Sequence, residues 1–143
     1  MSLYQFFESD RQLEEYDNQR IVLDSKKQIL KGRRGKVSIS DERNAIRILV
    51  EDDKECMNLY TDKKYGAFLE WNYTDKNAEE ILRYISNHLK KTREIELWNV
   101  WLGSKEQIKI KKCCVDNLSI ADIKNIWGQE FFKNAECLKI YRR

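Results

Sequence analysis

Apolar and polar residues alternate through the middle of this chain, and the pattern predicts a sheet there. Between residues 44 and 73, apolar side chains recur at every second position in successive runs, which turn-like segments at residues 52–54 and 62–64 separate. Period-two runs bounded by such segments are typical of half-buried strands. We therefore expect an antiparallel meander over residues 44–73, with Met57 and Leu59 on the same face of its middle strand.

Residues 94–102 predict a further strand that has no polar face. Apolar side chains point to both of its sides: Ile95, Leu97 and Trp101 to one, and Trp98, Val100 and Leu102 to the other. A strand of this kind lies in the middle of a sheet that is covered on both faces, or it keeps one aromatic face for a partner.

Trp98 and Trp101 are the candidate partner-binding residues of this strand. Because they are three positions apart, their side chains cannot both face the same layer. One of them lies under a second helix, such as the one predicted at the N-terminus, or is exposed, and exposed tryptophans are enriched at the energetic centres of protein interfaces. We expect the less buried of the two to lie in, or at the rim of, a partner interface.

Apolar residues with helical spacing predict two or three amphipathic helices. The strongest pattern covers residues 75–90, with Asp75 or Asn77 as N-cap and a buried stripe formed by Ile81, Leu82, Ile85 and Leu89. A second helix is expected to begin at residues 119–122, where Ser-Ile-Ala-Asp resembles a capping box. Residues 3–16 carry a weaker helical stripe.

Together these patterns predict a single α+β domain over residues 1–143. Further short strands are expected at residues 21–23, 107–115 and 137–141. The order of the elements favours a mostly antiparallel sheet of about six strands, with the two or three helices packed on it.

Composition and charge limit the classes of partner that we expect for this protein. The chain has 27 Lys and Arg residues against 24 Asp and Glu, and the net charge of +3 is too mild to indicate nucleic acid or membrane by itself. Glu8 and Asp10 interrupt the N-terminal apolar residues before a signal peptide develops, and no apolar run approaches membrane-spanning length. We expect a cytoplasmic protein without a membrane partner.

The cysteines are expected to be reduced and buried, and we expect neither a metal site nor a cofactor. Cys56, Cys113, Cys114 and Cys137 form no C-x-x-C pair. The adjacent Cys113 and Cys114 would point to opposite faces of a strand, so they cannot reach one ion together. Proline is absent and only five glycines occur, which argues against a glycine-rich phosphate loop.

Residues 26–36 form the one charge cluster that stands out. Six of these eleven residues are Lys or Arg, and Arg33 and Arg34 lie between Gly32 and Gly35, where the backbone could approach a phosphate. This gives the hypothesis of a nucleic-acid-associated domain that also uses the two C-terminal arginines. Nucleic-acid platforms, however, usually interleave aromatic with basic residues, and none occurs here. A solvated loop, or a loop that meets an acidic protein partner, is favoured.

Catalytic chemistry has weaker candidates. His88 is the only histidine, and it lies at the border of the apolar stripe near the end of helix 75–90, so contact with the last helical carbonyls is favoured over acid–base catalysis. Glu70 and Glu96 each lie within a strongly apolar strand. If these strands are neighbours, the two carboxylates form part of a composite enzyme site. Two carboxylates that face water are favoured over that arrangement.

In three segments the chain resembles small single-domain immunity proteins of bacterial toxin–immunity systems. The segments are the strand end at Glu70-Trp71, the helix over residues 75–91 and the Trp-Asn-Val-Trp-Leu-Gly strand at residues 98–103, which together cover under half of the chain. The resemblance implies a compact, cytoplasmic, often α+β protein that binds one toxin domain and catalyses nothing. Nuclease-blocking immunity proteins tend to be acidic, whereas this chain is mildly basic, so the toxin need not be directed at nucleic acid.

These observations rank three hypotheses. The first is a non-enzymatic protein-binding module, in its most specific form an immunity protein, whose partner-binding residues are Trp98, Trp101, Arg33 and Arg34. The second is a nucleic-acid-associated domain that uses residues 26–36. The third is a small enzyme with its site near Glu70 and Glu96.

Overall fold

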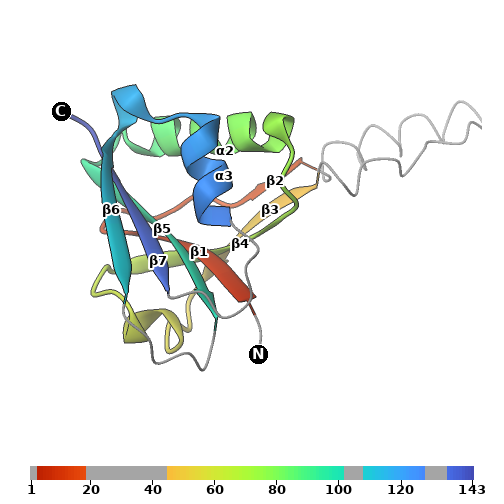
Figure 1. Ribbon diagram of the computed structural model, residues 1–143. Helices are drawn as coiled ribbons and strands as arrows, with labels where there is room; N and C mark the ends of the chain where they lie inside the picture. Colours follow the sequence, from red (N-terminus) through yellow and green to blue (C-terminus); the bar gives the residue numbers. More distant parts are fainter. Residues whose placement is uncertain (1–2, 19–44, 102–107, 128–134) are drawn as a thin grey trace, which may run out of the picture.

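The computed structural model describes residues 3–18, 45–101, 108–127 and 135–143, and in these ranges the chain forms one seven-stranded sheet with two α-helices (Figure 1). The strands are β1 (Leu3–Ser9), β2 (Tyr16–Asp17), β3 (Ile46–Glu51), β4 (Tyr65–Trp71), β5 (Glu94–Trp101), β6 (Lys109–Cys114) and β7 (Glu136–Tyr141). The helices are α2 (Asp75–His88) and α3 (Ile120–Trp127), and the 3-10 turns are η2 (Met57–Leu59) and η3 (Val115–Asn117). The predicted α+β class is confirmed, and the sheet has one strand more than expected.

The strand order is β2-β3-β4-β1-β5-β7-β6, and each neighbouring pair is antiparallel except β6 and β7. The predicted mostly antiparallel sheet is therefore confirmed. β5 lies between β1 and β7, and its residues 95–100 are buried on both faces. Of the two interpretations of its apolar faces, the central position in a covered sheet is the correct one.

The N-terminal residues form the central strand β1, so the helix predicted over residues 3–16 is wrong. Phe6 and Phe7 are adjacent and both buried, one on each face of the sheet. A short apolar run buried on both faces lacks the alternation that identifies a half-exposed strand, and its spacing also fits a helical stripe. The predicted strand at residues 21–23 and the basic segment 26–36 lie outside the described residues.

The middle strand of the predicted meander is also wrong, because Met57–Leu59 form the turn η2. Its main chain closes a tight turn, in which the Tyr60 N–H donates to the Met57 carbonyl oxygen at 2.9 Å. Met57 is buried whereas Leu59 is exposed, so the two side chains do not share a face. Strands β3 and β4 therefore pair directly with each other, antiparallel, where the predicted meander placed a strand between them.

Both helices begin with a side-chain cap. The Thr74 hydroxyl oxygen accepts a hydrogen bond from the Asn77 N–H at 3.0 Å, so the N-cap of α2 lies one residue before the predicted Asp75. For the second helix the predicted capping pair is confirmed, since the Asp122 carboxylate accepts from the Ser119 N–H at 3.0 Å. Neither helix of the described ranges combines the length and the apolar content that a membrane span requires.

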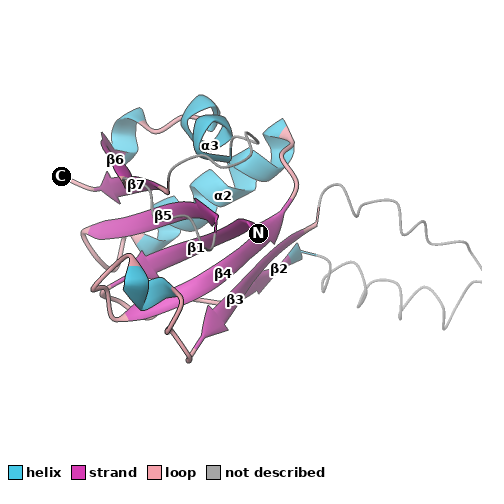
Figure 2. Ribbon diagram, turned by 60° about the horizontal axis from the view of Figure 1, so that its bottom comes forward, coloured by secondary structure: helices cyan, strands magenta, loops and turns pink. Residues whose placement is uncertain are grey.

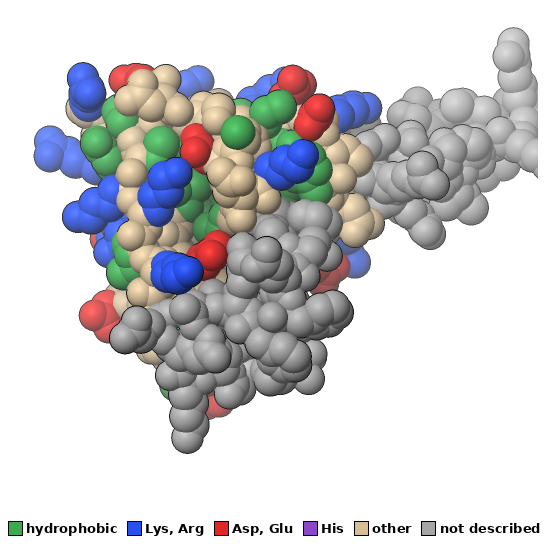
Figure 3. Space-filling model, in the orientation of Figure 1, with side chains coloured by type: hydrophobic (Ala, Val, Ile, Leu, Met, Phe, Trp, Pro, Cys, Tyr) green, Lys and Arg blue, Asp and Glu red, His purple; other side chains and the backbone are tan. Residues whose placement is uncertain are grey.

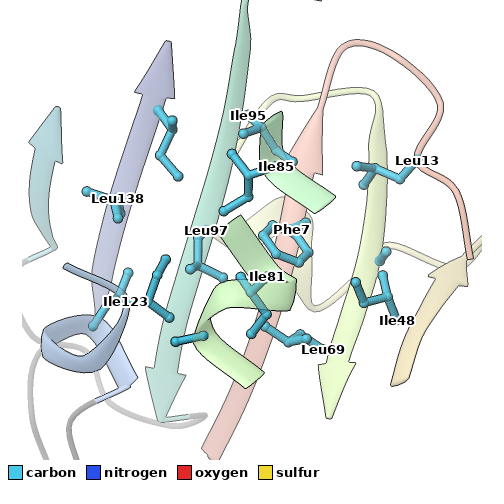
Figure 4. Close-up of a cluster of buried hydrophobic side chains, with 14 of the residues drawn as sticks. Phe7, Leu13, Ile48, Leu69, Ile81, Ile85, Ile95, Leu97, Ile123 and Leu138 are labelled. Carbon is cyan, nitrogen blue, oxygen red and sulfur yellow. The ribbon is translucent and has the colours of Figure 1, made fainter. Parts of the chain in front are cut away.

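The two helices cover one face of the sheet and bury a large apolar core there (Figures 1 and 4). We call it the helix-side core; its members include Phe7, Ile48, Leu69, Ile81, Ile85, Ile95, Leu97, Ile123 and Leu138. A smaller cluster lies on the other face, where η2 also lies (Figure 2). We call it the opposite-face core; its buried members are Phe6, Met57, Trp98, Val100, Ala135 and Cys137.

The cysteines are all free, and their burial differs from one to another. Cys114 and Cys137 are buried as predicted, and Cys113 is half-buried. Cys56 is exposed just before η2, contrary to the expectation that all four thiols are buried.

Substitutions in α2 test the helix-side core. Ile85 and Leu82 both belong to the apolar stripe predicted from the sequence. Ile85 is fully buried in the core, whereas Leu82 is only partly buried against it. We expect Ile85→Ala to lower the free energy of unfolding by about 2–5 kcal/mol, and Leu82→Ala to lower it by clearly less. Denaturant titrations of both variants measure the difference. Equal losses would contradict the packing of α2.

Candidate functional site

Trp98 lies in the interior, on the face of the sheet opposite the helices. Its side chain is 2% exposed, its ring stacks on Phe6 with the centroids 6.0 Å apart, and Tyr60 packs against it at 5.7 Å. The indole Nε1 donates a hydrogen bond to Glu96 Oε1 at 2.9 Å. Trp98 is therefore a core residue rather than an exposed anchor for a partner.

The other partner-binding residues suggested by the sequence cannot be placed in the same way. The main chain of Trp101 pairs with Leu3 at the end of the β1–β5 ladder, and its indole lies outside what the structure describes. Arg33 and Arg34 also lie outside the described ranges.

A groove lies on the face that carries the opposite-face core. It encloses about 520 Å³ between the segment around η2 and the sheet edge formed by β6 and β7. Leu59 is 75% exposed on one wall, and Ile108 and Ile110 are 42% and 53% exposed on the other. Three of the four large apolar side chains that are exposed in the described ranges therefore line one groove.

The interior of the groove is polar as well as apolar. Lining it beside Trp98 are Glu96 and Lys139, whose Oε2 and Nζ atoms lie 3.6 Å apart. Thr61 donates a hydrogen bond from Oγ1 to Glu96 Oε1 at 2.7 Å. With the Trp98 indole on the same oxygen, the buried Glu96 carboxylate is held by three partners. A carboxylate satisfied in this way has a structural role at the base of the groove.

Glu8 lies beside Glu96, since the two residues face each other in the β1–β5 register. Its side chain is 0% exposed, and the Lys54 ammonium lies 2.9 Å from Glu8 Oε2 as its counter-ion. Burial raises the pKa of the Glu8 carboxyl to about 7, and the nearby charge of Glu96 adds to the rise that Lys54 opposes. Neither oxygen of Glu8 accepts a well-directed hydrogen bond from a described residue, so this carboxyl is poorly solvated when ionised.

Gly66 makes this close packing possible. A methyl group on its Cα would lie 2.4 Å from Met57 Sδ and 2.8 Å from Glu8 Oε1, closer than real contacts allow. Any larger residue would displace the side chains of Met57 and Glu8, so glycine at this position lets η2 pack on β4 beside the buried carboxyl.

The segment around η2 is thus fastened to the sheet at three points: by Lys54 on Glu8, by Met57 in the opposite-face core and by Thr61 on Glu96. Lys54 also donates to the main-chain carbonyl of Lys63. Because this segment forms one wall of the groove, these buried contacts hold that wall in place. The η2 wall of the groove is therefore preformed.

The composite site of Glu70 and Glu96 does not form. β1 lies between β4 and β5, so the two carboxylates are on strands that are not neighbours. Glu70 is largely exposed and lies 3.7 Å from Arg47, its neighbour on β3. Glu96 is buried, so the expectation that both face water is right for Glu70 and wrong for Glu96.

The structure also joins Ser9 and His88, a pair that sequence reasoning missed. Ser9 Oγ lies 2.7 Å from His88 Nε2, and the Arg11 N–H donates to the same Oγ at 3.1 Å. Burial and the Lys91 ammonium lower the pKa of His88. A serine–histidine contact can activate a nucleophile, but Ser9 is fully buried, so the pair instead ties the end of β1 to the end of α2. The expected contact of His88 with helical carbonyls is replaced by this one.

No group of three or more His, Cys, Asp or Glu side chains within the described ranges is arranged to hold a metal ion. No protein-family model matches the chain, and no curated protein or solved structure was found to be similar to it.

Proposed function

We propose that this protein is a non-enzymatic, cytoplasmic protein-binding module and that the groove is its partner site. The observation that carries the proposal is the convergence of Leu59, Ile108 and Ile110, all exposed, on one groove. Exposed apolar side chains that cluster, with charged residues around them, are typical of protein interfaces.

The polar groups of the groove support a binding role. The Glu96 carboxylate accepts hydrogen bonds from Thr61 and Trp98 and forms an ion pair with Lys139. On the wall of the groove, the Lys63 ammonium lies 3.0 Å from the carboxylates of both Asp10 and Glu94. These contacts hold the walls in place. The same arrangement leaves an apolar rim with fixed charges beside it, which gives a protein partner both contact area and orientation.

The specific form of the proposal is an immunity protein whose partner is a toxin domain. Its support is the resemblance of three segments to such proteins, at residues 70–71, 75–91 and 98–103. Because the chain is mildly basic, with a net charge of +3, the toxin need not be directed at nucleic acid.

Capture of the partner tests the binding role. We expect Leu59→Asp and Ile110→Asp each to weaken partner binding at least about tenfold, because an added charge would be buried in the interface. Lys76→Gln, which changes the net charge equally on the exposed start of α2, is the matched control and should bind normally. The measurement is recovery of the partner from lysate of the native cell, followed by an affinity titration with the purified partner. Undiminished binding by both groove variants would remove the groove from the interface.

The toxin proposal has its own readout. The captured protein should arrest growth when it is expressed alone in a bacterium, and co-expression of this chain should restore growth. The Ile110→Asp variant should fail to restore it. A partner without toxicity leaves the binding role in place and rejects the immunity role.

A further inference from the structure

β6 is the last strand of the sheet and pairs only with β7 among the described strands. The Lys109 N–H donates to the Ala135 carbonyl oxygen at 2.8 Å, so the main-chain groups of Lys109 point toward β7. In a parallel ladder the N–H and C=O of one residue point to the same side, and successive residues alternate. The main-chain groups of Ile110 and Lys112 therefore point outward, away from the sheet.

The same two residues present their side chains on the groove face. Ile110 lies opposite Cys137 in the β6–β7 register, and Cys137 belongs to the opposite-face core. Lys112 lies opposite Lys139, so two lysines are neighbours on this face. One edge of the groove thus combines main-chain groups that pair with no described strand, an apolar side chain and positive charge.

The charge on β6 is only partly balanced. On the helix side the Lys111 ammonium lies 3.5 Å from the Asp122 carboxylate. On the groove side Lys139, on the neighbouring strand β7, forms an ion pair with Glu96. Lys109 and Lys112 are exposed and have no carboxylate partner within the described part of the chain. Figure 3 shows Lys and Arg side chains gathered along the margin of the molecule where β6 lies.

We propose that β6 accepts an extended, acidic segment of the partner protein as an eighth strand of the sheet. This inference rests on the proposed function and specifies its partner chemistry. The outward N–H and C=O groups of Ile110 and Lys112 supply the main-chain hydrogen bonds, as in other cases of strand addition to a sheet edge. Lys112 selects a carboxylate, and Ile110 with Ile108 selects an apolar side chain.

The spacing of Ile110 and Lys112 predicts a motif. Both side chains lie on the groove face and are two positions apart, and a strand that pairs with β6 repeats this period. The bound segment should therefore carry an apolar residue and an acidic residue separated by one position. The lysines of β6 also discourage pairing with a second copy of the same edge, because like charges would then meet. The lysines of β6 thus disfavour pairing with β6 of a second copy and favour pairing with an acidic strand.

A synthetic peptide tests this inference with the full-length protein. The probe is a capped octapeptide, Val-Thr-Glu-Thr-Val-Thr-Glu-Thr, titrated into the isotopically labelled protein and followed by NMR. We expect the amide signals of Ile110 and Lys112 to shift and their hydrogen exchange to slow. A version with Lys in place of Glu should not bind, and Lys112→Glu should weaken binding of the acidic peptide at least about tenfold. Lys76→Glu, the same charge reversal on α2, should bind within about twofold of the wild type.

Main-chain pairing is tested with two further peptides, each N-methylated at one set of alternate residues. Loss of binding with at least one set supports strand addition, because a methyl group removes a donor that the ladder needs. The inference is overturned if both methylated peptides bind as tightly as the parent, or if the acidic peptide does not bind. Either outcome leaves the proposed function standing as long as Leu59→Asp and Ile110→Asp impair capture of the partner, so the two failures are distinguishable.

Discussion

Trp98→Ala is expected to lower the free energy of unfolding by about 3–5 kcal/mol, the largest effect of any single substitution proposed for this protein. The change removes a fully buried indole from the opposite-face core and leaves a cavity between Phe6 and Tyr60. It also removes a hydrogen-bond donor from the buried Glu96 carboxylate. Guanidinium titrations followed by circular dichroism measure the loss.

Trp98→Phe is the control for this experiment. It keeps an aromatic ring against Phe6 but loses the indole N–H, so it should cost about 1–2 kcal/mol, well below the alanine variant. A loss under about 1 kcal/mol for Trp98→Ala would show that the indole is not part of the core. Because Trp98 also lines the groove, the alanine variant is unsuitable as a test of partner binding.

Glu8→Gln is expected to change how stability depends on pH. The folded pKa of Glu8, about 7, lies above its ordinary value of 4.5, so the folded protein binds more protons than the unfolded chain between these values. The stabilising effect of the protonated carboxyl is complete below about pH 4.5 and is lost as the pH rises through 7. Glutamine resembles the protonated acid at every pH, so the variant escapes this loss.

The advantage of Glu8→Gln over the wild type should therefore grow by about 3 kcal/mol between pH 4.5 and pH 8.5. Urea titrations of both proteins across this range measure it. His88 titrates in the opposite sense, because its lowered pKa makes the folded protein less stable as the pH falls below 6.5. His88 is present in both proteins, so its contribution cancels in the difference. A difference that does not change with pH would contradict the burial of an ionisable Glu8.

The elements that could be predicted from the sequence are those whose pattern has one physical explanation. α2 has a long apolar stripe at a single period, and Ser119 with Asp122 forms a cap within four consecutive residues. β5 is apolar on both faces over eight residues, which places it in the middle of a covered sheet. β1 has the same environment, but its Phe6-Phe7 pair is too short to distinguish a strand from a helix.

The groove and its support could not be predicted, because they depend on contacts between distant residues. Glu8 and Glu96 become neighbours only through the β1–β5 register, and Ser9 and His88 are 79 residues apart in sequence. The alternation of isoleucine and lysine at residues 108–111 was a signal for an exposed strand. Nothing in the sequence indicated that Leu59 would face it across a groove.

The central position of β1 has a consequence for how the chain folds. In the register, Phe6 lies opposite Phe68 on one side and Trp98 on the other, so both pairings of β1 join residues that are far apart along the chain. Non-local pairings of this kind form slowly, because the intervening chain loses entropy before the contacts stabilise it. β3 and β4 are close in sequence and can pair with each other early, but the two sides of the sheet are not joined until β1 enters between β4 and β5. We expect this insertion to limit the rate of folding, and until it is complete the apolar edges of β4 and β5 are open to mispairing and aggregation.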